Sequence, residues 1–147
     1  MSRLTLDQAS TIVDAALEKG HELRLHPLTV AVLDSGGQLK ALKREDGSSL
    51  LRPEIAMGKA WGTLGMGFGG REFARRVAAN PAFIQALTVA SGGRIVPAPG
   101  GVLIRAAPGG EIIGAVGISG DVSEKDEICA VHGIAAASLT PDTGDPS

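Results

Sequence analysis

Glycine and the scarcity of aromatic side chains constrain this 147-residue chain more than any other feature. The chain contains 21 glycines, its aromatic fraction is 3%, and it has no tyrosine. Glycine accepts left-handed turns and close backbone approaches that a Cβ atom forbids. We therefore expect tight turns, elements pressed closely together, and a core built from aliphatic side chains.

The length fits a single domain, which we place over residues 1–138, followed by a polar tail over 139–147 that we expect to be disordered. The net charge is −2 and no Lys/Arg cluster stands out, so nucleic acid is not an expected partner. A single cysteine excludes an internal disulfide. No apolar stretch reaches the roughly 18 residues of a membrane span, and the start of the chain lacks a signal-peptide pattern. A cytoplasmic location is therefore expected.

Helical patterns predict five helices. Thr5 and Gln8 form a capping box before an apolar periodicity that ends at Gly20. Pro53 begins a second helix that runs to about residue 66 and whose small residues predict close packing on a sheet or on another subunit. Two short helices are predicted over 72–79 and 82–89. A last helix is predicted from 123 to about 138, with Asp126 as the capping-box partner of Ser123.

Two β-hairpins separate these helices. Strands are predicted over 29–33 and 38–43, and again over 102–106 and 111–119. The segment 91–101 reads as an ordered loop with one β-bridge at Ile95-Val96, because glycine and proline interrupt it. Paired hairpins imply an antiparallel sheet with helices on at least one face, which is an α+β or α/β layered architecture.

Several common site motifs fail in context. The glycines over 65–70 follow a helix, whereas a dinucleotide fingerprint follows a strand. The glycines over 114–120 precede a helix whose first turn holds Glu124, Asp126 and Glu127, and these acids would repel a phosphate. The three histidines are scattered and form no metal motif, so no metal site is predicted.

Three motifs in combination carry a family resemblance. They are Ser91-Gly-Gly-Arg-Ile-Val-Pro-Ala-Pro-Gly-Gly101, then Gly114-Ala-Val-Gly-Ile-Ser-Gly120, then Asp126-Glu127. With Thr29 to Gly37 and Pro53 to Ala60, they make the chain resemble the GlcG/HbpS-like family over about residues 4–138. This family is also called the haem-degrading domain family and occurs as the C-terminal domain of PduO-type proteins.

The resemblance implies a profilin-like fold with an antiparallel sheet of about five strands. It also implies a homo-oligomer, often an octamer, and some members bind haem or a corrinoid. A haem would need an iron ligand, for which His26 is the candidate in this chain. The alternative for His26 is a solvated histidine in a loop.

Our leading hypothesis is a protein that binds a small ligand, either a small organic acid or haem or another tetrapyrrole. Its pocket would be formed by the loop 91–101, the strand end 114–120 and the second helix. Lys59 and Arg94 would hold a carboxylate, Arg94 with the geometry of a fork. Glycine amides would approach the anion closely. The expected ligand-binding residues are Gly92, Gly93, Arg94, Pro99, Gly100, Gly101, Gly117, Ser119 and Gly120.

The alternative hypothesis is an enzyme of small-acid or aromatic catabolism, an isomerase, hydratase or lyase. Lys59 or Arg94 would then hold the substrate, and Glu127 or Asp34 would transfer a proton. Asp34 has a structural alternative as an Asx-turn residue, and Glu127 could pair with Lys59. A third possibility is a protein whose function is assembly.

Overall fold

The computed structural model describes residues 3–145. In this range the helices are α1 (Leu6–Glu22), α2 (Arg52–Met66), α3 (Gly70–Ala79), α4 (Pro81–Ala90) and α5 (Ser123–Ala136). The strands are β1 (Thr29–Asp34), β2 (Leu39–Arg44), β3 (Gly101–Arg105), β4 (Ile112–Ser119) and β5 (Thr140–Asp142). The Thr5 capping box forms as predicted.

The five strands form one antiparallel sheet in the order β2-β1-β4-β3-β5. β4 lies at its centre, and Thr29 of β1 faces Ser119 of β4. This pairing brings the two predicted hairpins side by side. The α+β class and the sheet of about five strands are confirmed.

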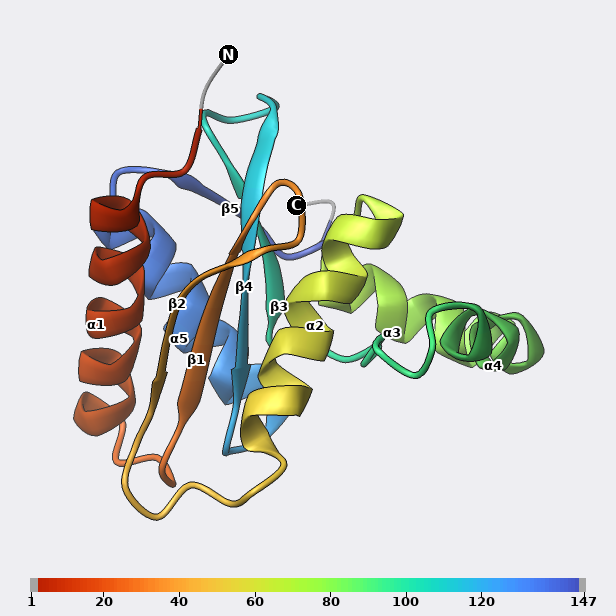
Figure 1. Cartoon of the computed structure of the whole chain (residues 1–147), viewed down its shortest axis with the longest axis horizontal. Coiled ribbons are helices and arrows are strands. Elements are labelled where there is room, and N and C mark those ends of the chain that lie inside the picture. The colour runs from red at the N-terminus through yellow and green to blue at the C-terminus, as the bar shows by residue number, and fades with distance from the viewer. Residues whose placement is uncertain (1–2, 146–147) are drawn as a thin grey trace.

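Helices cover both faces of the sheet (Figure 1). On one face α1 and α5 pack against each other and enclose a core of aliphatic side chains, among them Ile12, Val30, Val116 and Ile134. On the other face α2 lies across β1, β4 and β3 over a thinner layer that includes Ala60 and Ala115. Small side chains at this contact let α2 lie close to the sheet.

Glycine sets the distance between α2 and its neighbours. A Cβ atom on Gly117 of β4 would overlap the carbonyl oxygen of Ala56 on α2. On α2 itself, a Cβ on Gly58 would lie 2.6 Å from the carbonyl oxygen of Arg94. The close packing predicted for this helix is therefore confirmed, against β4 on one side and against the segment around Arg94 on the other.

The loop from 91 to 100 contains no strand, so the bridge predicted at Ile95-Val96 is wrong. The Val96 amide instead donates a hydrogen bond to the carbonyl oxygen of Gly58, at 3.2 Å. Because α2 supplies the partner, the loop is fixed to a helix and not to a strand.

The polar segment after 139 also differs from the prediction of a disordered tail. Thr140–Asp142 form β5 and pair with β3, where the Arg105 guanidinium donates to the Asp142 carboxylate at 2.9 Å. Residues 146 and 147 of the predicted tail lie outside the described residues. A short polar strand at a sheet edge has little apolar periodicity, so composition alone does not reveal it.

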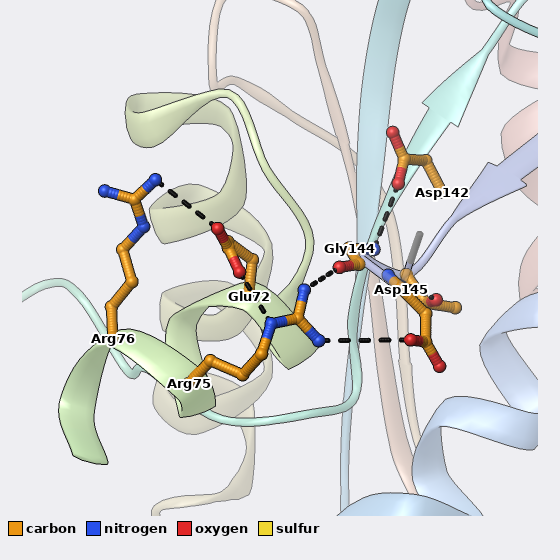
Figure 2. A network of polar contacts seen from close by, with 7 residues as sticks. Glu72, Arg75, Arg76, Asp142, Gly144 and Asp145 are labelled. Carbon is orange, nitrogen blue, oxygen red and sulfur yellow. Dashed lines mark hydrogen bonds and ion pairs between the residues drawn. The ribbon is translucent and has the colours of Figure 1, made fainter. Parts of the chain in front are cut away.

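Residues 140–145, which we call the C-terminal strap, tie α3 to the sheet. The Arg71 amide at the start of α3 donates to the carbonyl oxygen of Thr143 at 3.0 Å. Arg75 donates to the carbonyl oxygen of Gly144 and also lies 3.9 Å from the Asp145 carboxylate (Figure 2). α3 and α4 project away from the sheet, and the strap secures the base of this arm (Figure 1).

Among residues 3–145, no helix has both the length and the apolar character that a bilayer crossing requires.

Candidate functional site

A cavity of about 520 Å³ lies beside α2, between this helix, the β1–β2 hairpin and the loop after α4. Its walls are mostly aliphatic, with one indole, one carboxylate and one guanidinium. The lining residues are Leu33, Gly37, Leu39, Leu51, Glu54, Ile55, Met57, Gly58, Trp61, Gly93, Arg94 and Val96. Such a size and composition are usual for a small-molecule site.

Arg94 lies over the indole ring of Trp61 at one end of this cavity. Its guanidinium carbon is 3.9 Å from the centre of the indole ring, a cation–π contact. Within residues 3–145 the Arg94 side chain has no hydrogen bond or ion pair, so its N–H donors have no acceptor in the described protein. Arg94 is thus a cation held in place by stacking, with its hydrogen-bonding edge available.

The glycines that precede Arg94 have a local structural role. Gly92 and Gly93 adopt left-handed backbone angles, with φ of 71° and 82°. Their amides donate to the carbonyl oxygens of Val89 and Thr88, which ends α4. These two N–H groups are already bonded inside the chain, although Gly93 does line the cavity.

Lys59 lies on the sheet side of α2, outside the cavity lining. Its side chain is 5% exposed, and its ammonium donates to the carbonyl oxygen of Ile118 at 2.9 Å and to the Asp126 carboxylate at 3.4 Å. Burial lowers the pKa of Lys59 below its ordinary 10.5, although Asp126 opposes this effect. Burial likewise raises the pKa of Asp126 from 3.8 to about 6, with Lys59 opposing. The structure therefore places Lys59 and Arg94 in different surroundings, Lys59 against the sheet and Arg94 at the cavity.

Asp126 and Glu127 contact partners that the sequence does not reveal. The capping-box role predicted for Asp126 is wrong, because Val122 is the N-cap of α5 and Asp126 accepts from the Asp121 amide while facing Lys59. Glu127 does not pair with Lys59. It pairs with Arg71 of α3 at 2.8 Å, and its other carboxylate oxygen is buried without a hydrogen-bond partner among the described residues.

The other predicted site residues lie in the sheet or its turns. Asp34 accepts hydrogen bonds from the amides of Gly36 and Gln38, so it forms the Asx turn that the sequence offered as its alternative role. The hydroxyl of Ser119 accepts from Arg52 at 3.0 Å. The remaining predicted residues, Pro99, Gly100, Gly101, Gly117 and Gly120, are not part of the cavity lining.

Histidine is not part of the cavity lining. His26 is exposed, and its amide donates to Asp121. His21 pairs with Glu45, and His132 is exposed on α5. In the described range no three histidine, cysteine or acidic residues gather in a way that could hold a metal ion. Among the lining residues, Met57 alone is of a side-chain type that commonly ligates haem iron.

Sequence reasoning missed most of the cavity wall. Met57 and Trp61 lie four residues apart and so share one face of α2, but the sequence does not show whether that face packs in a core or lines a cavity. The sequence does not indicate that Leu33 of β1 and Leu39 of β2 line a cavity, because apolar strand residues look alike whether they face a helix or a cavity.

The comparisons with known proteins agree over nearly the whole chain. The family model described as haem degrading protein HbpS-like matches residues 4–135. An uncharacterized 15.0 kDa protein from the dhaT-dhaS intergenic region of Citrobacter freundii is 28% identical over 130 residues, which is 88% of this chain and 89% of that protein.

Two solved structures share the fold. The crystal structure of a PduOC:heme complex has a TM-score of 0.84 and 28% identity, and the match covers 98% of this chain and all of that one. The structure of Klebsiella pneumoniae protein ORFY has a TM-score of 0.83 and 26% identity, over 94% of this chain and 93% of that one. Because the family model spans most of its length, this chain belongs to the HbpS-like haem-degrading protein family.

Proposed function

We propose that this protein binds a haem-type tetrapyrrole in the cavity beside α2. The observation that carries the proposal is an apolar cavity of about 520 Å³ with an unpaired arginine stacked at one end. The similar PduOC structure, which is a complex with heme, supports the ligand class.

The cavity fits the two chemical parts of such a ligand. A tetrapyrrole has a flat apolar ring, which Leu33, Leu39 and Ile55 can cover. It also has carboxylates at its edge, for which Arg94 offers a planar fork of N–H donors. Because the guanidinium already lies over Trp61, less side-chain entropy is lost on binding than for an arginine without such a contact.

A bound haem supplies an iron that can exchange electrons or hold a small axial ligand. The residues that would hold the group are the apolar walls and Arg94, with Met57 as the soft donor in the lining. Since His26 lies outside the lining, we expect the replacement His26→Ala to leave the affinity unchanged.

Titration with hemin tests the proposal, with the fluorescence of Trp61, the single tryptophan, and the Soret band as readouts. We expect Arg94→Gln to weaken binding about tenfold, because a charge-assisted hydrogen bond is lost. The matched control is Arg24→Gln, an exposed arginine outside the cavity lining.

Metal-free protoporphyrin and glycolate complete the experiment. Equal affinity for protoporphyrin and hemin would show that ring and carboxylates dominate binding. Stabilisation by glycolate without any porphyrin binding would instead support the small-organic-acid ligand predicted from the sequence. A protein that binds neither porphyrin, or binds both equally well after Arg94→Gln, contradicts the proposed site.

The catalytic roles predicted for Lys59, Glu127 and Asp34 stay predictions, as does a homo-oligomer, which light scattering against the 14.9 kDa chain would measure.

A further inference from the structure

We infer that Glu54 makes the cavity selective for tetrapyrroles whose carboxylates all lie along one edge of the ring. The inference rests on the proposed function, because it concerns the same cavity. It assigns to Glu54, at the end of the cavity opposite Arg94, the role of weakening the binding of ligands that have carboxylates on a second edge.

The two charged groups mark opposite ends of the cavity. Glu54 and Trp61 both line it and lie seven residues apart on α2, which is two helical turns or about 10 Å along the helix axis. Arg94 lies over Trp61, so the guanidinium belongs to the end away from Glu54. Between the two ends the α2 wall consists of Ile55, Met57 and Gly58, which carry no charge.

The loop that carries Arg94 packs directly against α2. The Val96 amide donates to the carbonyl oxygen of Gly58, and a Cβ on Gly58 would lie 2.6 Å from both the Arg94 carbonyl oxygen and a Val96 methyl carbon. The backbone of the loop that carries Arg94 is therefore seated directly on α2 at Gly58. From there the Arg94 side chain extends over Trp61, on the side of Gly58 away from Glu54.

No nearby cation neutralises Glu54 in the described protein. Within residues 3–145 its carboxylate makes no hydrogen bond or ion pair. The neighbouring cations are engaged elsewhere: Arg52 donates to Ser49 and Ser119, and Lys59 faces Asp126 on the sheet side of α2.

A ligand with carboxylates on one edge can satisfy this polarity in a single orientation, with its acidic edge at Arg94 and its apolar edge towards Glu54. A ligand with carboxylates on both edges must place one of them near Glu54 and near exposed Leu51. At about 6 Å and an effective dielectric constant of about 40, the repulsion between two carboxylates corresponds to roughly tenfold in affinity.

The test compares protoporphyrin IX, whose two carboxylates share one edge, with coproporphyrin III, whose four carboxylates surround the ring. Affinities are measured by quenching of Trp61 fluorescence in the wild-type protein, in Glu54→Gln, and in the control Glu18→Gln on the opposite face of the sheet. We expect Glu54→Gln to reduce the preference for protoporphyrin by five- to tenfold, mostly by improving coproporphyrin binding. The control should leave the preference unchanged.

Ionic strength provides a second readout. The preference of the wild-type protein should fall as salt rises from about 10 mM to 1 M, where the Debye length drops to about 3 Å, and that of Glu54→Gln should not. An unchanged preference in Glu54→Gln, with protoporphyrin still bound, overturns the role of Glu54 while leaving the proposed function intact. If neither porphyrin binds the wild-type protein, both the role of Glu54 and the proposed function are overturned.

Discussion

Replacing Lys59 by methionine removes one partner of a buried ion pair and leaves Asp126, which is 1% exposed, without its counter-charge. Burial already raises the pKa of Asp126 from 3.8 to about 6 with Lys59 in place. A shift of that size corresponds to about 3 kcal/mol of penalty for the ionised carboxylate at pH 8. That penalty is already present in the wild-type protein, and Lys59→Met adds to it the loss of the attraction between Lys59 and Asp126. We therefore expect Lys59→Met to lower the free energy of unfolding by a further amount of about 3 kcal/mol at pH 8.

The loss should be smaller at pH 5. The folded protein binds a proton at Asp126 more tightly than the unfolded chain does, so this group favours folding fully below about pH 4 and loses that contribution as pH rises through about 6. In Lys59→Met the pKa of Asp126 rises further, and the carboxyl is neutral at pH 5. The remaining cost is the lost hydrogen bond to Ile118, about 1 kcal/mol.

Urea unfolding at both pH values measures these differences. The double replacement Lys59→Met with Asp126→Asn completes a cycle, because the asparagine oxygen can still accept from the Asp121 amide. We expect it to be more stable at pH 8 than Lys59→Met alone by about 1 to 3 kcal/mol. An equal loss at both pH values, or a double variant as unstable as the two single losses added together, would refute this reasoning.

Three further predictions concern the fold. Gly117→Ala should destabilise the protein by about 3 kcal/mol, because the new Cβ atom would overlap the Ala56 carbonyl. Gly65→Ala should stabilise the protein by up to about 1 kcal/mol, because Gly65 has open space around it and alanine favours the helix. Thermal unfolding of the two variants measures the difference. Cys129, buried and with its pKa raised by burial to about 11, should react with a disulfide reagent only after denaturant is added. Removal of residues 140–147 should speed amide exchange in α3 much more than in α1, and equal exchange in both would contradict the role assigned to the C-terminal strap.

Local signals in the sequence predict the elements well. The Thr5 capping box, the proline that opens α2 and the glycine-rich turns each act within a few residues, so they can be identified without tertiary information. The small face of α2 even predicts its close contact with a neighbour, which the structure identifies as Gly117 and the segment after Arg94.

Pairings across long stretches of chain could not be predicted in the same way. Asp126 has capping-box spacing from Ser123, but a lysine 67 residues earlier determines where its carboxylate points. The partner of Glu127 lies 56 residues earlier, on a helix whose position depends on the C-terminal strap. The cavity combines residues of β1, β2, α2 and the loop after α4, so its shape exists only once these elements are assembled.

The position of β4 also affects how the protein is made. β1 ends at Asp34, but its second pairing partner begins only at Ile112. At about 5 to 20 residues per second, a ribosome needs roughly 4 to 16 s to synthesise the intervening segment. For that time the nascent chain presents a mostly apolar strand with one unpaired edge, which is the kind of segment that chaperones shield and that aggregates in their absence. Expression at low temperature, where hydrophobic association weakens, should therefore increase the yield of folded protein.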